Sequence, residues 1–146
     1  MKYLVSEVFK MIHNAKWKSE KLDILYKFKT DAIMKILIIN FDKTIIPLVP
    51  LGIPNNYRKN ESPAGVGHSY LDTKWRELHR FFKGGDNTIT NAKRSQLYTI
   101  FLESLHQDDA QVVIWAVEKS LPSHYKGLSK AITSETWPQI VWDERL

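Results

Sequence analysis

The strongest constraint on the fold lies between Asp42 and Gly67, where helix-breaking residues are concentrated. Proline removes a backbone donor and collides with the preceding turn of a helix, and glycine weakens a helix interior. The segment contains four prolines and three glycines, namely Pro47, Pro50, Pro54, Pro63, Gly52, Gly65 and Gly67. We therefore predict a long connection over 42–67, with extended stretches such as 44–49 lying against the core.

Apolar residues at helical spacing predict three helices before this connection. The first covers residues 3–14, and the second begins after Lys16 and ends at Phe28. The third covers 32–41, is apolar on nearly every side, and has Thr30 as its N-cap. In the second helix we expect four side chains to face the core: Trp17, Leu22, Leu25 and Tyr26.

The same spacing predicts helices after the connection. They cover 70–83, 91–106, a stretch starting at Asp108, and 129–136. The helix starting at Asp108 is again largely apolar. In the helix over 91–106, Ile100 is among the side chains expected to face the core. The chain is therefore predicted to be all-α, with about seven irregularly packed helices and little or no sheet. We expect one domain over 1–146, with helices within 1–41 and 68–138 and a short tail at 139–146.

Composition limits the classes of protein that fit. A length of 146 residues, 43% hydrophobic residues and 25% charged residues suit one globular domain. The absence of cysteine excludes disulfides and thiolate metal sites. The longest apolar run, at 36–39, is too short to cross a membrane, and the N-terminus does not resemble a signal peptide. A net charge of +5 permits binding to DNA or another polyanion.

Catalytic patterns are weak throughout the chain. The five histidines have no spacing that places two imidazoles on one metal ion, and no serine has a nucleophile-elbow context. Gly84-Gly85 lacks the lysine and hydroxyl residue of a phosphate-binding loop. We expect no enzymatic activity and no cofactor, and find no support for a hydrolase or nuclease.

The segment 117–138 contains the most specific candidate site. It is predicted to hold the end of one helix, a basic turn at Lys126-Gly127, and a new helix start at Ser129 and Lys130. Free amides at a helix start bind phosphate, and glycine lets the backbone approach it. The alternative is a helix-terminating glycine flanked by two solvated lysines.

Three other basic points are also predicted at turns beside helices. They are Lys83, Gly84 and Gly85; Thr90, Lys93 and Arg94; and Arg58 with Lys59. Amides, hydroxyls and cations at such places position a protein on the DNA backbone without reading sequence. Each point taken alone also fits ordinary solvated surface charge. If they act together, we expect them to share one side of the bundle. The lysine-rich stretch at 16–29 is interleaved with acidic residues and is a weaker candidate.

Short motifs along most of the chain carry a resemblance to a known domain. They are SEVFKMIHNAKWKSEKLDILYKF, TDAIMKILIINFDKTI, HRFFKGGDNTITNAKRSQLYTIFLESLHQDDAQVVIWAV and YKGLSKAIT closing on TWPQI. They resemble the helical DNA-binding domain that precedes the catalytic core in phage ATP-dependent DNA ligases. The KGG, LESLH and PYKG-type turns are similar to those of a family of small uncharacterised proteins from large contractile-tailed phages. In this chain the turn reads His124-Tyr125-Lys126-Gly127, and Pro122 lies two residues before His124.

The ligase resemblance implies a module that grips backbone phosphates across the minor groove of duplex DNA. Ligase chemistry needs a lysine nucleophile in a Lys-x-Asp-Gly run, and this sequence has none. The resemblance therefore implies a DNA-binding accessory protein of phage replication, repair or recombination, acting in the cytoplasm of the infected host without ligase activity.

A second function remains open, that of an interaction module that kept the fold and lost the DNA site. Its partner would be a phage replication protein such as a sliding clamp, or a host protein. The long connection and the apolar tail containing Trp142 favour this alternative. One continuous positive face favours DNA, whereas scattered charge favours a protein partner.

Overall fold

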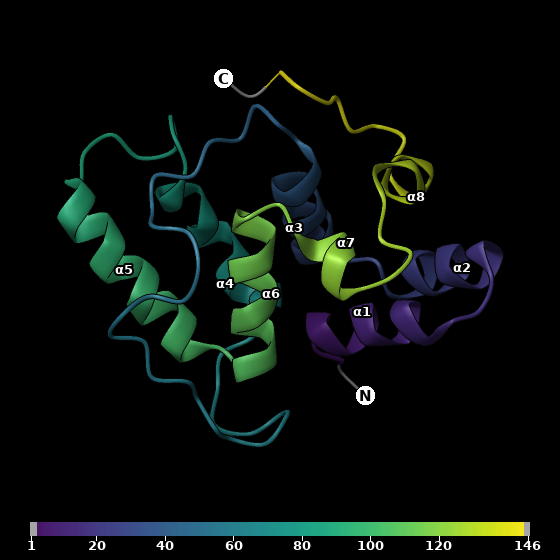
Figure 1. The fold of residues 1–146 in the computed structure, drawn as a ribbon, viewed down its shortest axis with the longest axis horizontal. Coiled ribbons are helices and arrows are strands. Elements are labelled where there is room, and N and C mark those ends of the chain that lie inside the picture. The colour runs from purple at the N-terminus through teal and green to yellow at the C-terminus, as the bar shows by residue number, and fades with distance from the viewer. Residues whose placement is uncertain (1–2, 145–146) are drawn as a thin grey trace.

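The computed structural model describes residues 3–144 and is all-α, which confirms the predicted class. Within these residues the chain forms eight α-helices, and one 3-10 helix, η1, continues α4; Figure 1 shows their arrangement. The elements are α1 (Val5–Asn14), α2 (Lys18–Phe28), α3 (Asp31–Phe41), α4 (Leu71–Lys74), η1 (Trp75–Phe81), α5 (Asn91–Ser104), α6 (Gln107–Val117), α7 (Leu121–His124) and α8 (Lys130–Thr136). Between residues 3 and 144, β pairing is limited to isolated bridges. No helix in this range is long and apolar enough to cross a bilayer.

The helix starts follow the expected capping chemistry. Thr30 Oγ1 accepts from the Ile33 amide at 3.1 Å, and Thr90 Oγ1 accepts from the Lys93 amide at the same distance. These bonds satisfy amide donors that the first turn of a helix leaves free. The His106 ring does the same for α6, where its Nδ1 accepts from the Asp108 amide at 3.0 Å.

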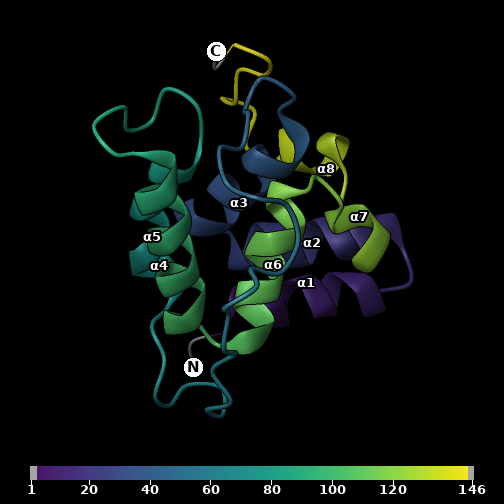
Figure 2. The ribbon, with the colours of Figure 1, turned by 60° about the vertical axis from the view of Figure 1, so that its left-hand side comes forward.

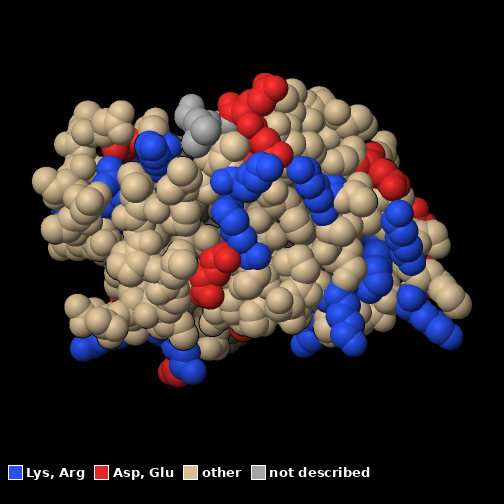
Figure 3. Space-filling view, turned by 45° about the horizontal axis from the view of Figure 1, so that its top comes forward, with Lys and Arg blue, Asp and Glu red and all other residues tan. Residues whose placement is uncertain are grey.

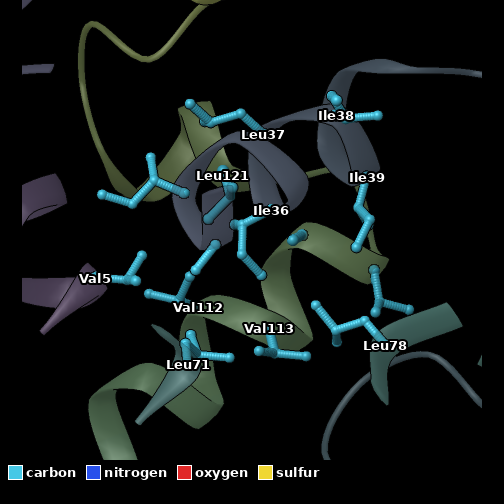
Figure 4. Packing of buried hydrophobic residues seen from close by; sticks show 14 of the residues in the cluster. Val5, Ile36, Leu37, Ile38, Ile39, Leu71, Leu78, Val112, Val113 and Leu121 are labelled. Carbon is cyan, nitrogen blue, oxygen red and sulfur yellow. The ribbon is translucent and has the colours of Figure 1, made fainter. Parts of the chain in front are cut away.

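Helices α3 and α6 form the centre of the core. Figure 4 shows their aliphatic side chains facing one another, with Val5 of α1, Leu71 of α4, Leu78 of η1 and Leu121 of α7 around them. Both helices are buried on most sides, as their nearly continuous apolar sequences predict. Burial of each such aliphatic side chain contributes about 1.5–3 kcal/mol.

The 42–70 segment contains no helix and is joined to the core by backbone bonds. The Leu48 amide donates to Phe81 O at 2.8 Å, and the Lys83 amide donates to Ile46 O at 2.9 Å. Ile45 and Val49 are buried. This part of the connection is therefore a packed, extended segment that pairs with the end of η1.

Several details differ from the sequence-based expectation. The helix predicted over 70–83 changes to 3-10 geometry at Trp75, which puts Leu78 and Phe81 on one buried face because 3-10 helices repeat every three residues. The short helix α7 was not expected. Three side chains predicted to face inward are exposed instead, namely Trp17, Tyr26 and Ile100.

The tail at 139–144 packs onto the bundle. Trp142 Nε1 donates to Ser134 Oγ on α8 at 3.0 Å, and the Asp143 amide donates to Asp42 Oδ2 at 3.1 Å. The Lys130 ammonium lies 5.1 Å from the centre of the Trp142 ring. Trp142 is consequently held against α8 and is not presented as a free apolar tail.

Arg94 is a structural residue, although the sequence suggested a phosphate contact. Its side chain is buried, with 3% of the residue exposed. Nε donates to Arg80 O at 2.8 Å, Nη2 donates to Asp86 O at 2.7 Å, and Nη1 donates to the side chain of Asn91. The guanidinium thus fixes the loop between η1 and α5, and its donors face away from solvent.

We expect Arg94→Lys to lower the free energy of unfolding by about 2 kcal/mol or more, because lysine keeps the charge but cannot donate in these directions at once. Urea denaturation measures the change. Lys93→Ala, at the exposed neighbouring position, should stay within about 0.5 kcal/mol of the unchanged protein. Equal stability of both variants would contradict the role assigned to Arg94.

Candidate polyanion-binding surface

Lysines from two distant parts of the sequence meet where α2 packs against α8. We call this set the α2–α8 basic surface; its exposed members are Lys16, Lys18, Lys126 and Lys130, and Lys21 joins the two segments through its hydrogen bonds. Lys21 Nζ lies 3.2 Å from Lys126 O, and Lys18 Nζ lies 3.6 Å from Glu135 Oε1 on α8. In Figure 3, Lys and Arg side chains gather on the right, over α2 and α8, apart from a smaller group on the left.

The Lys126-Gly127 turn is built differently from a phosphate-binding loop. The Lys126 amide donates to His13 Nδ1 at 2.9 Å and is therefore occupied. Gly127 has a φ of +93°, and a Cβ there would lie 2.2 Å from Lys21 Cδ. The glycine is required by the turn and by the Lys21 side chain that crosses it. What this turn offers an anion is the exposed Lys126 side chain, rather than its amide.

The start of α8 is also largely occupied. Ser129 Oγ accepts from the Ile132 amide at 3.2 Å, so the serine is an N-cap. The Lys130 ammonium lies 3.7 Å from Asp143 Oδ2 and is about half exposed. Lys130 can still face a polyanion, but the Asp143 carboxylate reduces the positive potential around it.

The Lys83-Gly84-Gly85 turn uses two of its three amides internally. The Lys83 amide bonds to Ile46 O, and the Gly85 amide bonds to Phe82 O at 3.1 Å. A Cβ on Gly85 would lie 1.8 Å from His79 O, so close packing explains this glycine. Gly84 has a φ of +83° and open space around it. Lys83 contributes an exposed side chain to this turn.

The four predicted basic points do not share one face. Figures 1 and 2 place the 83–90 loop and the start of α5, with Thr90 and Lys93, far from α7 and α8. Arg58 lies beside α5, where its amide donates to Glu103 Oε2 at 2.8 Å, and Lys59 is exposed next to it. The expectation of a single side was wrong, because the packing of α5 against η1 carries its start away from α8.

The structure adds Lys16, Lys18 and Lys21 to the candidate site. Sequence analysis treated them as a solvated helix face because acidic residues are interleaved with them. Glu20 and Asp23 are themselves exposed on α2. The one hint of this site in the sequence was the length of the Lys21 side chain. In the structure this side chain spans the corner between α1 and α2 and donates to Ile12 O at 2.6 Å. Its link to residue 126 cannot be read from local spacing.

A hollow of about 580 Å³ lies between α1 and α6, next to the basic surface. Glu7, Lys10, Met11 and Asn14 of α1 line it at helical spacing. The rest of its lining is formed by Tyr3, Leu4, Ser6, Ala64, His106, Asp108, Gln111, Trp115 and Tyr125. Because Tyr125 immediately precedes Lys126, the hollow and the basic surface are continuous along the chain.

Acidic side chains shape the electrostatics of this hollow. Burial raises the pKa of Asp109, whose Oδ1 accepts from the Ser6 amide at 2.9 Å. Burial, together with Asp108 and Asp109, raises the pKa of Tyr125 to about 12. The Tyr125 hydroxyl therefore stays protonated at neutral pH and remains a hydrogen-bond donor.

No group of three or more histidine, aspartate or glutamate side chains within residues 3–144 has an arrangement suited to a metal ion. The chemistry available at the α2–α8 basic surface is that of ammonium groups, which bind anions by charge. The hollow adds aromatic rings and hydrogen-bonding groups.

We expect Asp109→Asn to change the pH dependence of stability. In the folded protein Asp109 stays protonated at pH values above about 3.9, the pKa of an aspartate in the unfolded chain. Deprotonation of Asp109 therefore opposes folding, and stability falls as pH rises from about 4 through the raised pKa. Asparagine cannot titrate and can keep the acceptor for Ser6. Urea unfolding at a series of pH values should show the original protein losing stability relative to the variant as pH rises. Asp108→Asn, on the exposed side of α6, is the control. If the stability of Asp109→Asn depends on pH in the same way as that of the original protein, Asp109 is not the cause of the pH dependence.

No curated protein and no solved structure matches the chain. A family model does match, over residues 8–123, and so covers most of the sequence, from α1 to α7. The chain therefore belongs to the family described as Family of unknown function (DUF6433).

Proposed function

We propose that this protein is a non-enzymatic accessory protein that binds duplex DNA through backbone phosphates. The observation that supports this most directly is the α2–α8 basic surface, where Lys16, Lys18 and Lys126 are exposed together. Ammonium groups arranged along a surface attract phosphates without reading base sequence. The proposed setting is replication, repair or recombination of a large contractile-tailed phage, in the host cytoplasm, as the resemblance to phage ligase DNA-binding domains implies.

Carboxylates beside two of these lysines are compatible with a surface of moderate affinity for DNA. Glu135 lies 3.6 Å from Lys18, and Asp143 lies 3.7 Å from Lys130. Exposed ion pairs of this kind contribute little stability, so a phosphate can replace the carboxylate at small cost. Lys126 and Lys16 are exposed and form no such ion pair among residues 3–144, so they are the residues on which the proposal depends most.

Replacing Lys16, Lys18 and Lys126 together with glutamine should weaken binding to a blunt DNA duplex by about tenfold or more at low salt. The slope of log K against log salt should become shallower by about two to three, because each lysine that contacts a phosphate contributes nearly one. Fluorescence anisotropy across salt concentrations measures both quantities.

The control variant replaces Lys59, Lys83 and Lys93 with glutamine, which removes the same charge from other exposed positions. It should keep most of the affinity and the original slope. Equal weakening by the two triple variants would show a diffuse charge effect and contradict the assigned surface, and no binding of the unchanged protein at low salt would reject the DNA-binding proposal.

A protein-interaction module is the second candidate, and one observation favours it. Leu51, Ile53 and Ile100 are more than half exposed, and they line a hollow of about 540 Å³ between the 50–56 segment and α5. Apolar side chains exposed together around a concave surface are common where proteins bind one another. The proposed partner is a phage replication protein such as a sliding clamp, or a host factor.

For this candidate, Ile100→Glu should abolish co-purification of a single stoichiometric partner from infected cells after nuclease treatment, since a charge in the hollow opposes apolar contact. The triple variant at Lys16, Lys18 and Lys126 serves as the control and should retain the partner. Retention of the partner by Ile100→Glu would exclude this hollow as its binding site.

A further inference from the structure

We propose that the hollow between α1 and α6 binds an unpaired nucleotide base of the DNA held by the α2–α8 basic surface. This inference rests on the proposed DNA binding and adds a site for a base that is outside the double helix. A paired base inside a duplex has both faces stacked and its pairing edge occupied, so only a single-stranded or extruded base can enter a side pocket.

The size and position of the hollow suit a base attached to a backbone. Its volume of about 580 Å³ lies in the range of small-molecule sites. Lys10 is part of the lining, and Lys126 follows the lining residue Tyr125. A phosphate next to the bound base would thus meet ammonium groups while the base occupies the hollow.

Aromatic residues provide the surface for the base. Tyr3, Trp115 and Tyr125 all line the hollow. The Trp115 ring is held in place by His124, which stacks on it with ring centres 3.7 Å apart and planes 7° from parallel. Tyr125 meets Trp115 edge to face at 5.8 Å. Rings fixed in this manner lose little freedom when a base packs against them.

The polar lining indicates which bases fit. Asp108 supplies carboxylate oxygens, Glu7 supplies the oxygen that is not used to accept from the Leu4 amide, and Gln111 and Asn14 supply amide groups. Carboxylates accept hydrogen bonds from the exocyclic amino groups of bases, as they do from cytosine N4. Thymine has no amino group, and its one donor on the pairing edge, N3–H, lies between two carbonyl oxygens that the carboxylates repel. The hollow should therefore prefer cytosine, adenine or guanine to thymine.

The test compares a blunt duplex with the same duplex carrying a short single-stranded oligo-dC or oligo-dT tail, measured by anisotropy with the full chain. The dC-tailed duplex should bind about tenfold more tightly than the blunt one, and the dT-tailed duplex should gain less. Gln111→Trp fills the hollow and Gln111→Ala removes a polar group, and both should reduce the gain from the tail while blunt-duplex binding stays unchanged.

Gln96→Trp makes the larger change at an exposed position on α5 and should leave the gain intact. Equal binding of all three duplexes would overturn the base site and leave the proposed function standing. Binding of single-stranded oligo-dC without binding of the blunt duplex would overturn the proposed function and keep the base site. Absence of all DNA binding would overturn both. If a lysine-rich peptide then binds tightly and is weakened by salt alone, the acidic lining is instead a site for a cationic protein segment.

Discussion

Cationic side chains donate to backbone carbonyl oxygens at three places where helices or loops end, and much of the arrangement depends on these bonds. Lys21 closes the end of α1 through Ile12 O and reaches Lys126 O. Lys119 donates to Ile39 O and Asp42 O at the end of α3, at 2.6 and 2.8 Å. Arg94 binds the loop before α5. Each cation adds a donor to carbonyl oxygens at a helix end or a turn, and Lys21 and Lys119 in this way join segments that are distant in the sequence.

These bonds change how the positive charge of the protein should be understood. Of the 21 lysine and arginine residues, Lys21, Lys119 and Arg94 point at least partly inward, and burial lowers the pKa of Lys119 while Asp42 opposes this effect. The charge available to a polyanion is therefore smaller than the formal +5 suggests. It is concentrated where α2 meets α8, beside a hollow with aromatic and acidic lining. The proximity of these two features supports the proposal of a nucleic-acid surface more strongly than net charge does.

The helices were largely predictable because their signals are local. Thr30, Thr90 and Ser129 cap the helices that their positions indicated, and the apolar sequences of α3 and α6 correctly placed the core. The candidate site was less predictable, because whether a cation faces water depends on packing. Arg94 and Lys93 are adjacent in sequence, yet one is buried and the other exposed. The role of a glycine was equally hard to predict from the sequence. Gly85 and Gly127 lie in turns as expected, but nearby protein atoms explain why glycine is needed there, without a bound phosphate.

The contact between Gly127 and Lys21 links two positions that lie far apart in the sequence. A side chain at 127 would occupy the space of Lys21 Cδ, so it would displace the ammonium from Ile12 O and Lys126 O. A shorter residue at 21 would relieve the collision but leave the carbonyl oxygens at the end of α1 without this donor. Evolutionary drift at either position is therefore constrained by the other, and sequences that diverge at this corner have to change both residues or reshape the turn between α7 and α8.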